Sequence, residues 1–262
     1  MTRLLHLSDL HFGLQRQALV EPLVDRINAA GADLVVVTGD LTHRGRSAQF
    51  AQAAAFLRRI ESPLLAVPGN HDIPLYKLAE RMLRPWRRWR KAIAENLEPV
   101  GQVGNLRVQG LNSVDPMAWQ RGMVTPGQLA RVVAGLDPAC INVVALHHPM
   151  QQQPQVDKAL MQGARPALAG LEAEGAHLIL TGHLHRWSIG AFQGCRGRPV
   201  LQVQAGTALC ARPDDRQNEF AVLDFAGPDL LVARHVAPMD EPGFRPPQHL
   251  RFTRRGGLWR PA

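Results

Sequence analysis

The sequence predicts an α/β protein in which a largely parallel sheet is completed by an antiparallel part. Up to residue 185, short apolar runs alternate with stretches of helical spacing, which is the order that right-handed βαβ crossovers produce. From Trp187 onward, short strands follow one another without a helical period between them. The chain has 262 residues, of which 45% are hydrophobic and 20% charged, as is typical of a globular protein with a substantial core.

The first third of the chain supplies three strands connected by two helices. The strand before Gly39 is rich in β-branched residues and typical of a buried parallel strand. Gly31 is expected to stop the first helix, and Ser47 is expected to cap the second. The predicted elements are strand 4–7, helix 15–30, strand 32–38, helix 47–60 and strand 63–67.

The middle of the chain continues the alternation. Thr125 is expected as an N-cap with Pro126 at the first helical position. The predicted elements are helix 75–97 interrupted at Pro85, strand 106–111, helix 125–136, strand 141–146, helix 156–174 and strand 177–180. The antiparallel strands follow at 187–193, 199–204, 219–225 and 229–235.

The last residues are rich in Pro, Gly and Arg, and we expect them to wrap over the surface as a tail. No internal repeat or linker indicates a second domain. We therefore divide the chain into one domain, 1–237, and a basic tail, 238–262, packed on the same domain.

The composition restricts the class of protein. A formal charge of +8 and a pI near 10.6 favour anionic partners such as phosphates, nucleic acid or acidic surfaces. Three cysteines without a metal-type pair argue against a disulfide framework. The apolar run at the amino terminus is too short for a signal peptide, and no stretch reaches the roughly 18 apolar residues of a membrane span. A cytoplasmic location is predicted.

Five predicted strand ends carry polar residues that could bind metal. Because carboxyl ends of parallel strands share one edge of a sheet, these residues are expected to gather there. Any one end could be an ordinary turn, but five together are far less expected by chance. Oxygen and imidazole donors without thiolates suit Mn, Fe, Zn or Co, and the set is too large for one ion. The residues are Asp9 with His11, Asp40, Asn70 with His71, His147, and His183 with His185.

Alternation in an extended chain predicts that the two members of a pair such as Asp9 and His11 point to the same face. The same argument applies to His183 and His185. A turn in which Asn70, His71 and Asp72 follow directly on a strand needs Gly69, which lets the backbone turn and approach a ligand closely.

The motifs Asp-x-His, Gly-Asp, Gly-Asn-His-Asp, His-x-Pro and Gly-His-x-His occur in this order between residues 9 and 185. This ordered set resembles the calcineurin-like metallophosphoesterase superfamily. The residues of the motifs at 8–13 and 68–72, together with Gln-Ala-Gly-Thr at 204–207, are similar to those of the class III cyclic-nucleotide phosphodiesterase branch. The resemblance implies a four-layer α/β/β/α sandwich with two mixed sheets flanked by helices.

The resemblance also implies roles for residues. His71 would stabilise phosphate charge or protonate the leaving oxygen, and Asp72 would orient His71. A hydroxide between two divalent or mixed-valence transition metal ions would attack phosphorus in line. The first ion would be held by Asp9, His11, Asp40 and His185, and the second by Asp40, Asn70, His147 and His183.

Other residues have two interpretations. His43 and Arg44 follow Asp40 closely and could contact the substrate or be exposed loop residues; Arg212 and Asn218 could reach the site from the second sheet. The basic segment 81–91 could make a weak contact with a membrane or another anionic surface, or form a solvated face with its Trp rings packed inward.

The predicted function is hydrolysis of a phosphodiester, with a cyclic nucleotide or a glycerophosphodiester as options. The alternatives are a phosphomonoesterase, a nucleotide-sugar or lipid pyrophosphatase, and a metal-binding scaffold without catalysis. His71 argues against the pyrophosphatases, which typically have Arg there, and against the scaffold, which lacks this residue. The expected partner is the phosphoester substrate; no nucleic acid is required, and homo-oligomerisation is left open.

Overall fold

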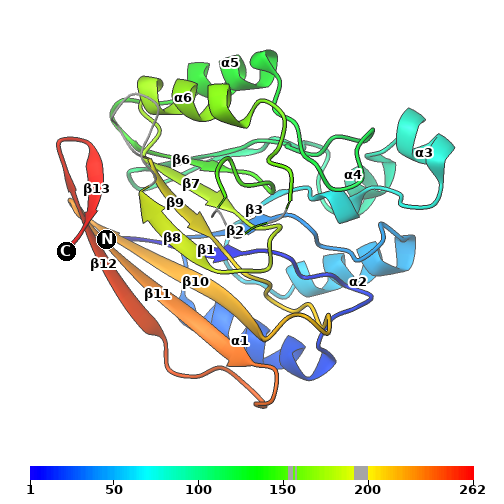
Figure 1. The fold of residues 1–262 in the computed structure, drawn as a ribbon. Coiled ribbons are helices and arrows are strands. Elements are labelled where there is room, and N and C mark those ends of the chain that lie inside the picture. Colours follow the sequence, from blue (N-terminus) through cyan, green and yellow to red (C-terminus); the bar gives the residue numbers. More distant parts are fainter. Residues whose placement is uncertain (153–155, 157, 192–199) are drawn as a thin grey trace.

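The computed structural model describes residues 1–152, 156, 158–191 and 200–262. Two mixed sheets pack face to face, and helices cover their outer faces (Figure 1). The predicted four-layer α/β/β/α sandwich is confirmed. In the part of the chain that is described, no helix has the length and apolar character that crossing a bilayer requires.

The first sheet has seven strands in the order β13-β12-β11-β10-β1-β2-β3. β1, β2 and β3 are parallel, and β10 joins the other side of β1 in antiparallel orientation. The strands are β1 (Thr2–Leu7), β2 (Leu34–Thr38), β3 (Leu64–Val67), β10 (Gln217–Ala226), β11 (Asp229–Pro238), β12 (Gln248–Arg255) and β13 (Leu258–Pro261).

The second sheet has six strands in the order β4-β5-β6-β7-β9-β8. Its four central strands are parallel, and the two edge strands are antiparallel to their neighbours. The strands are β4 (Val100–Val103), β5 (Leu106–Gly110), β6 (Ile141–Ala145), β7 (Leu178–Thr181), β8 (Ser188–Ala191) and β9 (Leu201–Gln204). The sequence did not predict β4, because its half-exposed residues form no apolar run.

Alternating side chains of one strand supply two different cores. In β1, Leu5 and Leu7 pack against the helices of the first sheet, while Leu4 lies between the two sheets. In β6, Val143 lies between the sheets and Val144 packs under the helices of the second sheet. A strand that is buried on both faces therefore appears in the amino-acid sequence as a continuous apolar run, as is typical of parallel strands.

The helices largely follow the predictions, with three differences. Arg46 rather than Ser47 occupies the N-cap of helix α2 (Ser47–Leu57). The segment 75–97 forms only two short helices around Pro85, since a proline disfavours helix in the residue before it. Helix α6 begins at Ala164, which leaves Pro166 in the first turn, where its missing amide costs little.

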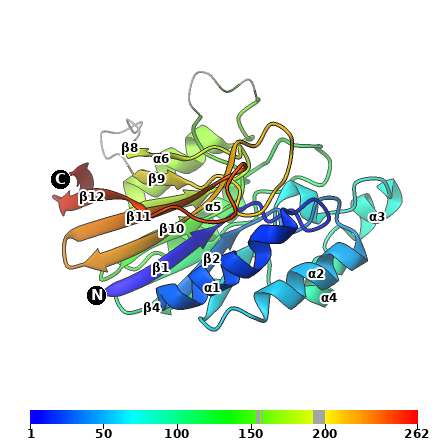
Figure 2. The same cartoon turned by 90° about the horizontal axis from the view of Figure 1, so that it is seen from below.

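Helices α1 and α2 cover the outer face of the first sheet, and α5 and α6 cover that of the second (Figures 1 and 2). Thr125 caps α5 by accepting a hydrogen bond from the Gln128 amide, and Pro126 is its first residue, as predicted. The helices are η1 (Gln17–Leu19), α1 (Val20–Ala30), α2 (Ser47–Leu57), η2 (Asn70–Asp72), α3 (Leu78–Leu83), α4 (Arg87–Ala92), α5 (Pro126–Ala134) and α6 (Ala164–Glu174).

The segment expected to be a tail on the surface instead contains β12 and β13, which extend the first sheet. Phe252 and Trp259 on these strands are buried between the sheets. The interpretation as a tail was wrong because the Pro and Arg residues obscured two short strands. Residues 192–199 are not described. They include Cys195, the end of the predicted strand 187–193 and the first residue of the predicted strand 199–204.

Candidate metal centre and active site

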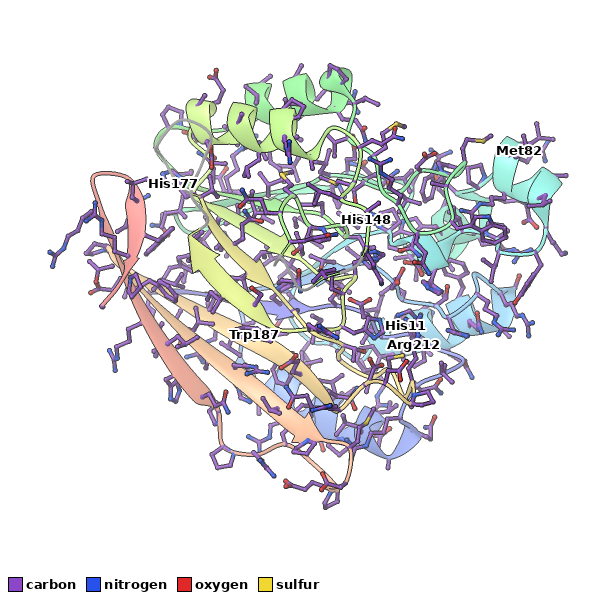
Figure 3. All side chains as sticks on the ribbon, in the orientation of Figure 1. His11, Met82, His148, His177, Trp187 and Arg212 are labelled. Carbon is purple, nitrogen blue, oxygen red and sulfur yellow. The ribbon has the colours of Figure 1, made fainter. Side chains whose placement is uncertain are left out.

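Five loops meet at one end of the sandwich and carry all seven residues predicted to bind metal. The loops follow β1, β2 and β3 of the first sheet and β6 and β7 of the second. The view with side chains places His11, Arg212 and His148 at this end and His177 far from it (Figure 3). Six of the seven predicted ligands are buried, and His185 is half-buried.

Among the described residues, the non-glycine residues with positive φ are Asp9, His11, Asp40, His183 and His185, and all five are predicted ligands. Their φ values lie between 48° and 72°. This conformation costs roughly 1–3 kcal/mol for a residue with a Cβ, and it persists at sites where the surroundings impose it. The predicted extended geometry of the pairs Asp9/His11 and His183/His185 is therefore wrong, although their side chains do converge.

Asp9, His11 and His185 form one half of the cluster. Asp9 Oδ1 lies 3.2 Å from His185 Nε2 and 3.5 Å from His11 Nε2. The two imidazole Nε2 atoms are 3.0 Å apart. Asp9 Oδ2 accepts hydrogen bonds from the Ser8 hydroxyl and the His183 amide, whereas Oδ1 is buried without a hydrogen-bond partner.

Asp40, Asn70, His147 and His183 form the other half. His147 Nε2 lies 3.2 Å from Asn70 Oδ1 and 3.3 Å from His183 Nδ1. Asp40 Oδ2 lies 3.4 Å from His147 Nε2 and 3.5 Å from His11 Nε2, so it faces both halves. Asp40 is thus the one carboxylate among these residues placed between the two groups of imidazoles.

These distances fit metal coordination. Donor atoms that share one ion at bond lengths of about 2.1 Å lie roughly 3.0–3.4 Å apart. The facing donors in both halves are 3.0–3.5 Å apart, and Asp9 Oδ1 is a buried anionic oxygen that two imidazole nitrogens face. The residues present therefore fit transition-metal ions with nitrogen and oxygen ligands.

The electrostatics of the cluster also favour cations. Burial opposes ionisation of Asp40, but His147 and His71 hold the pKa of this carboxyl well below its ordinary value. Burial opposes a charge on His147, yet Asp40 raises the pKa of this imidazole to about 9. Two buried carboxylates thus stabilise positive charge at the place where ions would bind.

His71 lies beside the cluster with one ring nitrogen fixed. Its Nδ1 donates to the His43 carbonyl oxygen at 2.6 Å, so the neutral ring carries its proton on Nδ1 and leaves Nε2 as an acceptor. Nε2 lies 3.2 Å from Arg212 Nη2. The backbone amide of His71 donates to Asp40 Oδ1, and its ring stands 4.9 Å from that of His11.

Asp72 does not orient the His71 ring, and this prediction was wrong. Its carboxylate is buried and accepts hydrogen bonds from the backbone amides of Gly69, Leu41 and Thr42. Asp72 therefore fastens the loop after β3 to the loop after β2. The carbonyl of His43, and not the Asp72 carboxylate, sets the tautomer of His71.

Gly69 is needed for space and not for its torsion angle. Its φ is −109°, which any residue can adopt. A Cβ built there would lie 2.2 Å from Asp40 Oδ1 and 2.3 Å from the Asp40 amide nitrogen. Only a glycine allows the loop after β3 to approach Asp40 this closely.

The structure separates the four substrate candidates. His43 stacks on His71 with ring centroids 5.7 Å apart, and Arg212 contacts His71 directly. Arg44 instead lies over the ring of Tyr76. Asn218 is buried and donates to the Cys210 carbonyl, so the expectation that it reaches the substrate is not met.

The sequence favoured His147 over His148 as the ligand, and both rings lie in one group of donors with His183. The ring nitrogens of His148 bond to the Ser113 hydroxyl and to the Gln120 carbonyl. Asp215 was missed: its carboxylate lies 2.9 Å from Nδ1 of His185 and fixes that ring. No motif surrounds Asp215, so only its position in space reveals it. Cys210 was also missed, and its sulfur lies in a cluster with His11 and His185.

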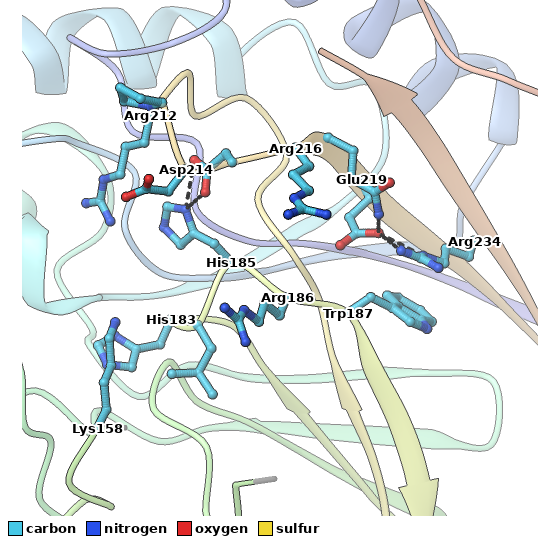
Figure 4. Close-up of a pocket in the computed structure, with 14 residues that line it drawn as sticks. Lys158, His183, His185, Arg186, Trp187, Arg212, Asp214, Arg216, Glu219 and Arg234 are labelled. Carbon is cyan, nitrogen blue, oxygen red and sulfur yellow. Dashed lines mark hydrogen bonds and ion pairs between the residues drawn. The ribbon is translucent and has the colours of Figure 1, made fainter. Parts of the chain in front are cut away.

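A cavity of about 900 Å³ opens beside His183 and His185 (Figure 4). Its walls come from the segment before α6, the loop between β7 and β8, and the loop that precedes β10. Lys158, Arg186 and Arg212 give it a basic lining. A cavity of this size accommodates a complete small-molecule ligand.

Residues 2–187 match the family model described as calcineurin-like phosphoesterase. The chain belongs to the calcineurin-like phosphoesterase family. The matched region contains all five loops of the candidate metal centre, which agrees with the resemblance in the motifs.

Two relatives of this family carry phosphodiesterase names. The chain is 25% identical over 155 residues to a probable cyclic nucleotide phosphodiesterase of Vesicomyosocius okutanii, a match covering 56% of this chain and 61% of the relative. It is 37% identical over 82 residues to the glycerophosphodiester phosphodiesterase GpdQ of Enterobacter lignolyticus, covering 26% and 29%. The matches thus span less than two thirds of each relative's length.

Solved structures support the fold. Purple acid phosphatase PPD1 from yellow lupin superposes with a TM-score of 0.70 at 13% identity, covering 95% of this chain and 53% of that one. Vps29 of Entamoeba histolytica complexed with zinc gives a TM-score of 0.52 at 16% identity, covering 95% and 99%. At these identities the likeness concerns the fold alone.

Proposed function

We propose that this chain is a dinuclear metal-dependent phosphodiesterase. The observation that carries the proposal is the position of Asp40 Oδ2, which lies within 3.5 Å of Nε2 of both His11 and His147. A carboxylate shared by two ions is the arrangement that clamps phosphoryl oxygens. The first ion would take Asp9, His11, Asp40 and His185, and the second would take Asp40, Asn70, His147 and His183.

Bound ions of this kind polarise phosphoryl oxygens and activate water as a nucleophile. The chain itself supplies the groups around the reacting phosphate. Arg212 is placed to bind a phosphoryl oxygen beside His71. With its Nδ1 proton held by the His43 carbonyl, His71 would protonate the leaving oxygen from its imidazolium form, which carries a second proton on Nε2.

The substrate class is proposed to be a phosphodiester, such as a cyclic nucleotide or a glycerophosphodiester. Both classes appear in the names of the relatives, and the cavity beside the centre is large enough for either. The phosphomonoesterase and pyrophosphatase alternatives share the same metal chemistry and differ in the groups around the phosphate. A scaffold without catalysis gives no role to His71 and Arg212, whose side chains contact each other beside the donor cluster.

The deciding experiment compares bis-p-nitrophenyl phosphate with p-nitrophenyl phosphate on the purified protein loaded with Mn²⁺. We expect a higher kcat/KM for the diester, followed by turnover of 3′,5′-cyclic AMP or of glycerophosphodiesters. Preference for the monoester would overturn the diesterase assignment. Absence of turnover with every ester, despite two bound ions, would favour the scaffold.

We also propose a weak contact with anionic lipid surfaces at and beside the segment 81–91. Nine large hydrophobic side chains are exposed among the described residues, and six of them lie at 76–83 and 117–119. Arg81 joins these two segments by donating to the Pro116 carbonyl and packing on the Trp119 ring at 5.4 Å. Exposed cations, including Arg84 and Arg87, border this apolar patch, as in surfaces that bind acidic lipids.

A further inference from the structure

Several cations in the cavity beside His183 and His185 have no partner of opposite charge among the residues that the structure describes. Their side chains line the cavity of about 900 Å³ (Figure 4). None of them forms an ion pair with any described residue, and the side-chain contact of Arg212 goes to His71. The cations are Lys158, Arg186, Arg212 and Arg216.

The carboxylates of the cavity do not neutralise this charge. Glu219 is held by Arg234, which also lies over the Trp187 ring at 5.2 Å. Asp215 is held by His185. Among the lining residues that are described, only the exposed Asp214 is left as an acid without such a partner.

The unpaired cations repel one another. Partial desolvation lowers the pKa of Lys158; Asp9 and Asp40 oppose this shift, while the positive charges of Arg212 and Arg186 add to it. Clustered like charges beside low-dielectric walls attract anions, and guanidinium groups bind phosphate with two parallel hydrogen bonds. The scissile phosphodiester carries a single negative charge, so it does not match the whole set.

The cations come from different segments of the chain. Arg212 contacts His71 and belongs to the scissile phosphate. Lys158 and Arg186 come from other elements, the segment before α6 and the turn between β7 and β8, and they border His183 and His185 from the side of the second sheet (Figure 4). A ligand that pairs with Lys158 and Arg186 as well as with Arg212 must carry more negative charge than one phosphodiester group supplies.

We propose that the substrate carries a second anionic group, a phosphate monoester, which Lys158 and Arg186 bind while Arg212 and His71 hold the phosphodiester. This inference rests on the proposed phosphodiesterase function and specifies the substrate of the same site. The second phosphate can stand on a nucleoside or on a glycerol unit, since both offer the same anion to the cations.

The first test compares pairs of diesters that differ only by a terminal phosphate. One pair is the dinucleotide ApA and its 5′-phosphorylated form; the other is glycerophosphoglycerol and its terminal phosphate. For the Mn-loaded protein, kcat/KM of the phosphorylated member is expected to be about tenfold higher or more, mainly through KM, as one charge-assisted contact gives. The pair that shows the preference identifies the carrier of the phosphate.

The variants show which residues cause the preference. In the Lys158→Ala/Arg186→Ala double variant, the ratio between the members of a pair should fall toward one. Arg165→Ala removes an exposed cation of α6 outside the cavity, and it should leave the ratio and the hydrolysis of bis-p-nitrophenyl phosphate unchanged. An unchanged ratio in the double variant would overturn the assignment of the two cations.

A binding measurement decides the case in which neither pair is cleaved. Calorimetry at fixed ionic strength compares adenosine 3′,5′-bisphosphate with adenosine 5′-monophosphate, and the bisphosphate should bind about tenfold more tightly unless Lys158 and Arg186 are replaced. Equal affinities in the unmodified protein would overturn the inference even if bis-p-nitrophenyl phosphate is hydrolysed. Failure to hydrolyse that diester would count against the proposed function instead.

Discussion

Asp40 and His147 belong to different sheets, yet Asp40 Oδ2 lies 3.4 Å from His147 Nε2. Asp40 follows β2 of the first sheet and His147 follows β6 of the second. The contact exists because both loops leave the carboxyl ends of their strands at the same end of the sandwich. The candidate metal centre therefore joins the two sheets.

The Asp40→Asn variant should lose metal from both positions. Asp40 faces His11 and His147 with an anionic carboxylate oxygen. The Asn side chain is neutral, so it no longer stabilises positive charge there. Elemental analysis after dialysis against Mn²⁺ should find less than half the metal bound by the unmodified protein. Asp25→Asn, on the exposed face of α1, serves as the control with the same chemical change and should retain full occupancy.

The His71→Ala variant should keep its metal and lose activity. The ring of His71 is not one of the predicted ligands, and its Nε2 lies 3.2 Å from Arg212 Nη2. A positioned His that transfers a proton typically contributes about 10²–10⁴-fold to the rate. We expect kcat for bis-p-nitrophenyl phosphate to fall by that factor with unchanged elemental analysis. An unaltered kcat would remove His71 from the mechanism.

The Asp72→Asn variant should behave differently from His71→Ala. Asp72 accepts amide hydrogen bonds from two loops, and an Asn side chain offers one acceptor oxygen where the carboxylate offers two. Leaving a buried donor without a partner costs about 1–3 kcal/mol. Denaturant unfolding should show a loss of this order, with weaker metal binding as a consequence. Loss of activity at full stability and full metal occupancy would contradict a purely structural role.

His177 should make stability depend on pH. Its Nδ1 accepts a hydrogen bond from the Asn142 amide, and burial together with Arg254 lowers its pKa to about 4. The unfolded chain binds this proton below about pH 6.5, so the contribution of the neutral ring is complete above that pH and declines toward pH 4.

The measurement compares the free energy of unfolding at pH 7.5 and pH 5 in the metal-free protein. The side chain of Gln does not titrate. Between pH 7.5 and pH 5, the free energy of unfolding of the His177→Gln variant should therefore fall by about 1 kcal/mol less than that of the unmodified protein. His177 lies far from the metal centre, so the ligands titrate alike in both proteins (Figure 3). If the free energy of unfolding falls equally in both proteins, the folded structure does not keep His177 neutral.

The apolar patch beside α3 should bind acidic vesicles weakly. Leu83 and Trp119 are 80% and 60% exposed, and replacing both by Glu removes apolar area and adds charge that acidic lipid repels. Sedimentation with phosphatidylserine-containing vesicles should detect the unmodified protein and not this variant. Val100→Glu changes another exposed hydrophobic residue, on β4, and should bind as the unmodified protein does. No sedimentation of the unmodified protein would end this proposal.

Much of the site follows from local sequence. An apolar run fixes where a strand lies, and the polar residues directly after it must emerge at the end of the sheet. The amino-acid sequence alone therefore places Asp9, Asp40, Asn70, His147 and His183 at that end. The order of the motifs then indicated the family and the ligand set, because the residues of each motif lie within a few positions of one another.

Other features required the tertiary structure. The roles of Asp72 and Asn218 depend on hydrogen bonds to loops that no local pattern identifies as their partners. Asp215 contacts His185 from a loop without a motif. Asp9 and His11 have positive φ, a backbone conformation imposed by packing at the loop ends. The alternation of side chains in an extended strand predicted correctly that the two side chains lie close together, but it is not the cause.

By itself, the sequence determined the α/β layers, the strand ends and the residue types that can bind metal, because periodicity and strand termini are local properties. Only the tertiary structure decided that Asp40 faces both groups of imidazoles and that the last strands extend the first sheet. It also decided that several cations without an ion pair in the described part of the chain gather in one cavity. These features depend on which distant segments meet, and that is fixed by the packing of two sheets rather than by any one segment.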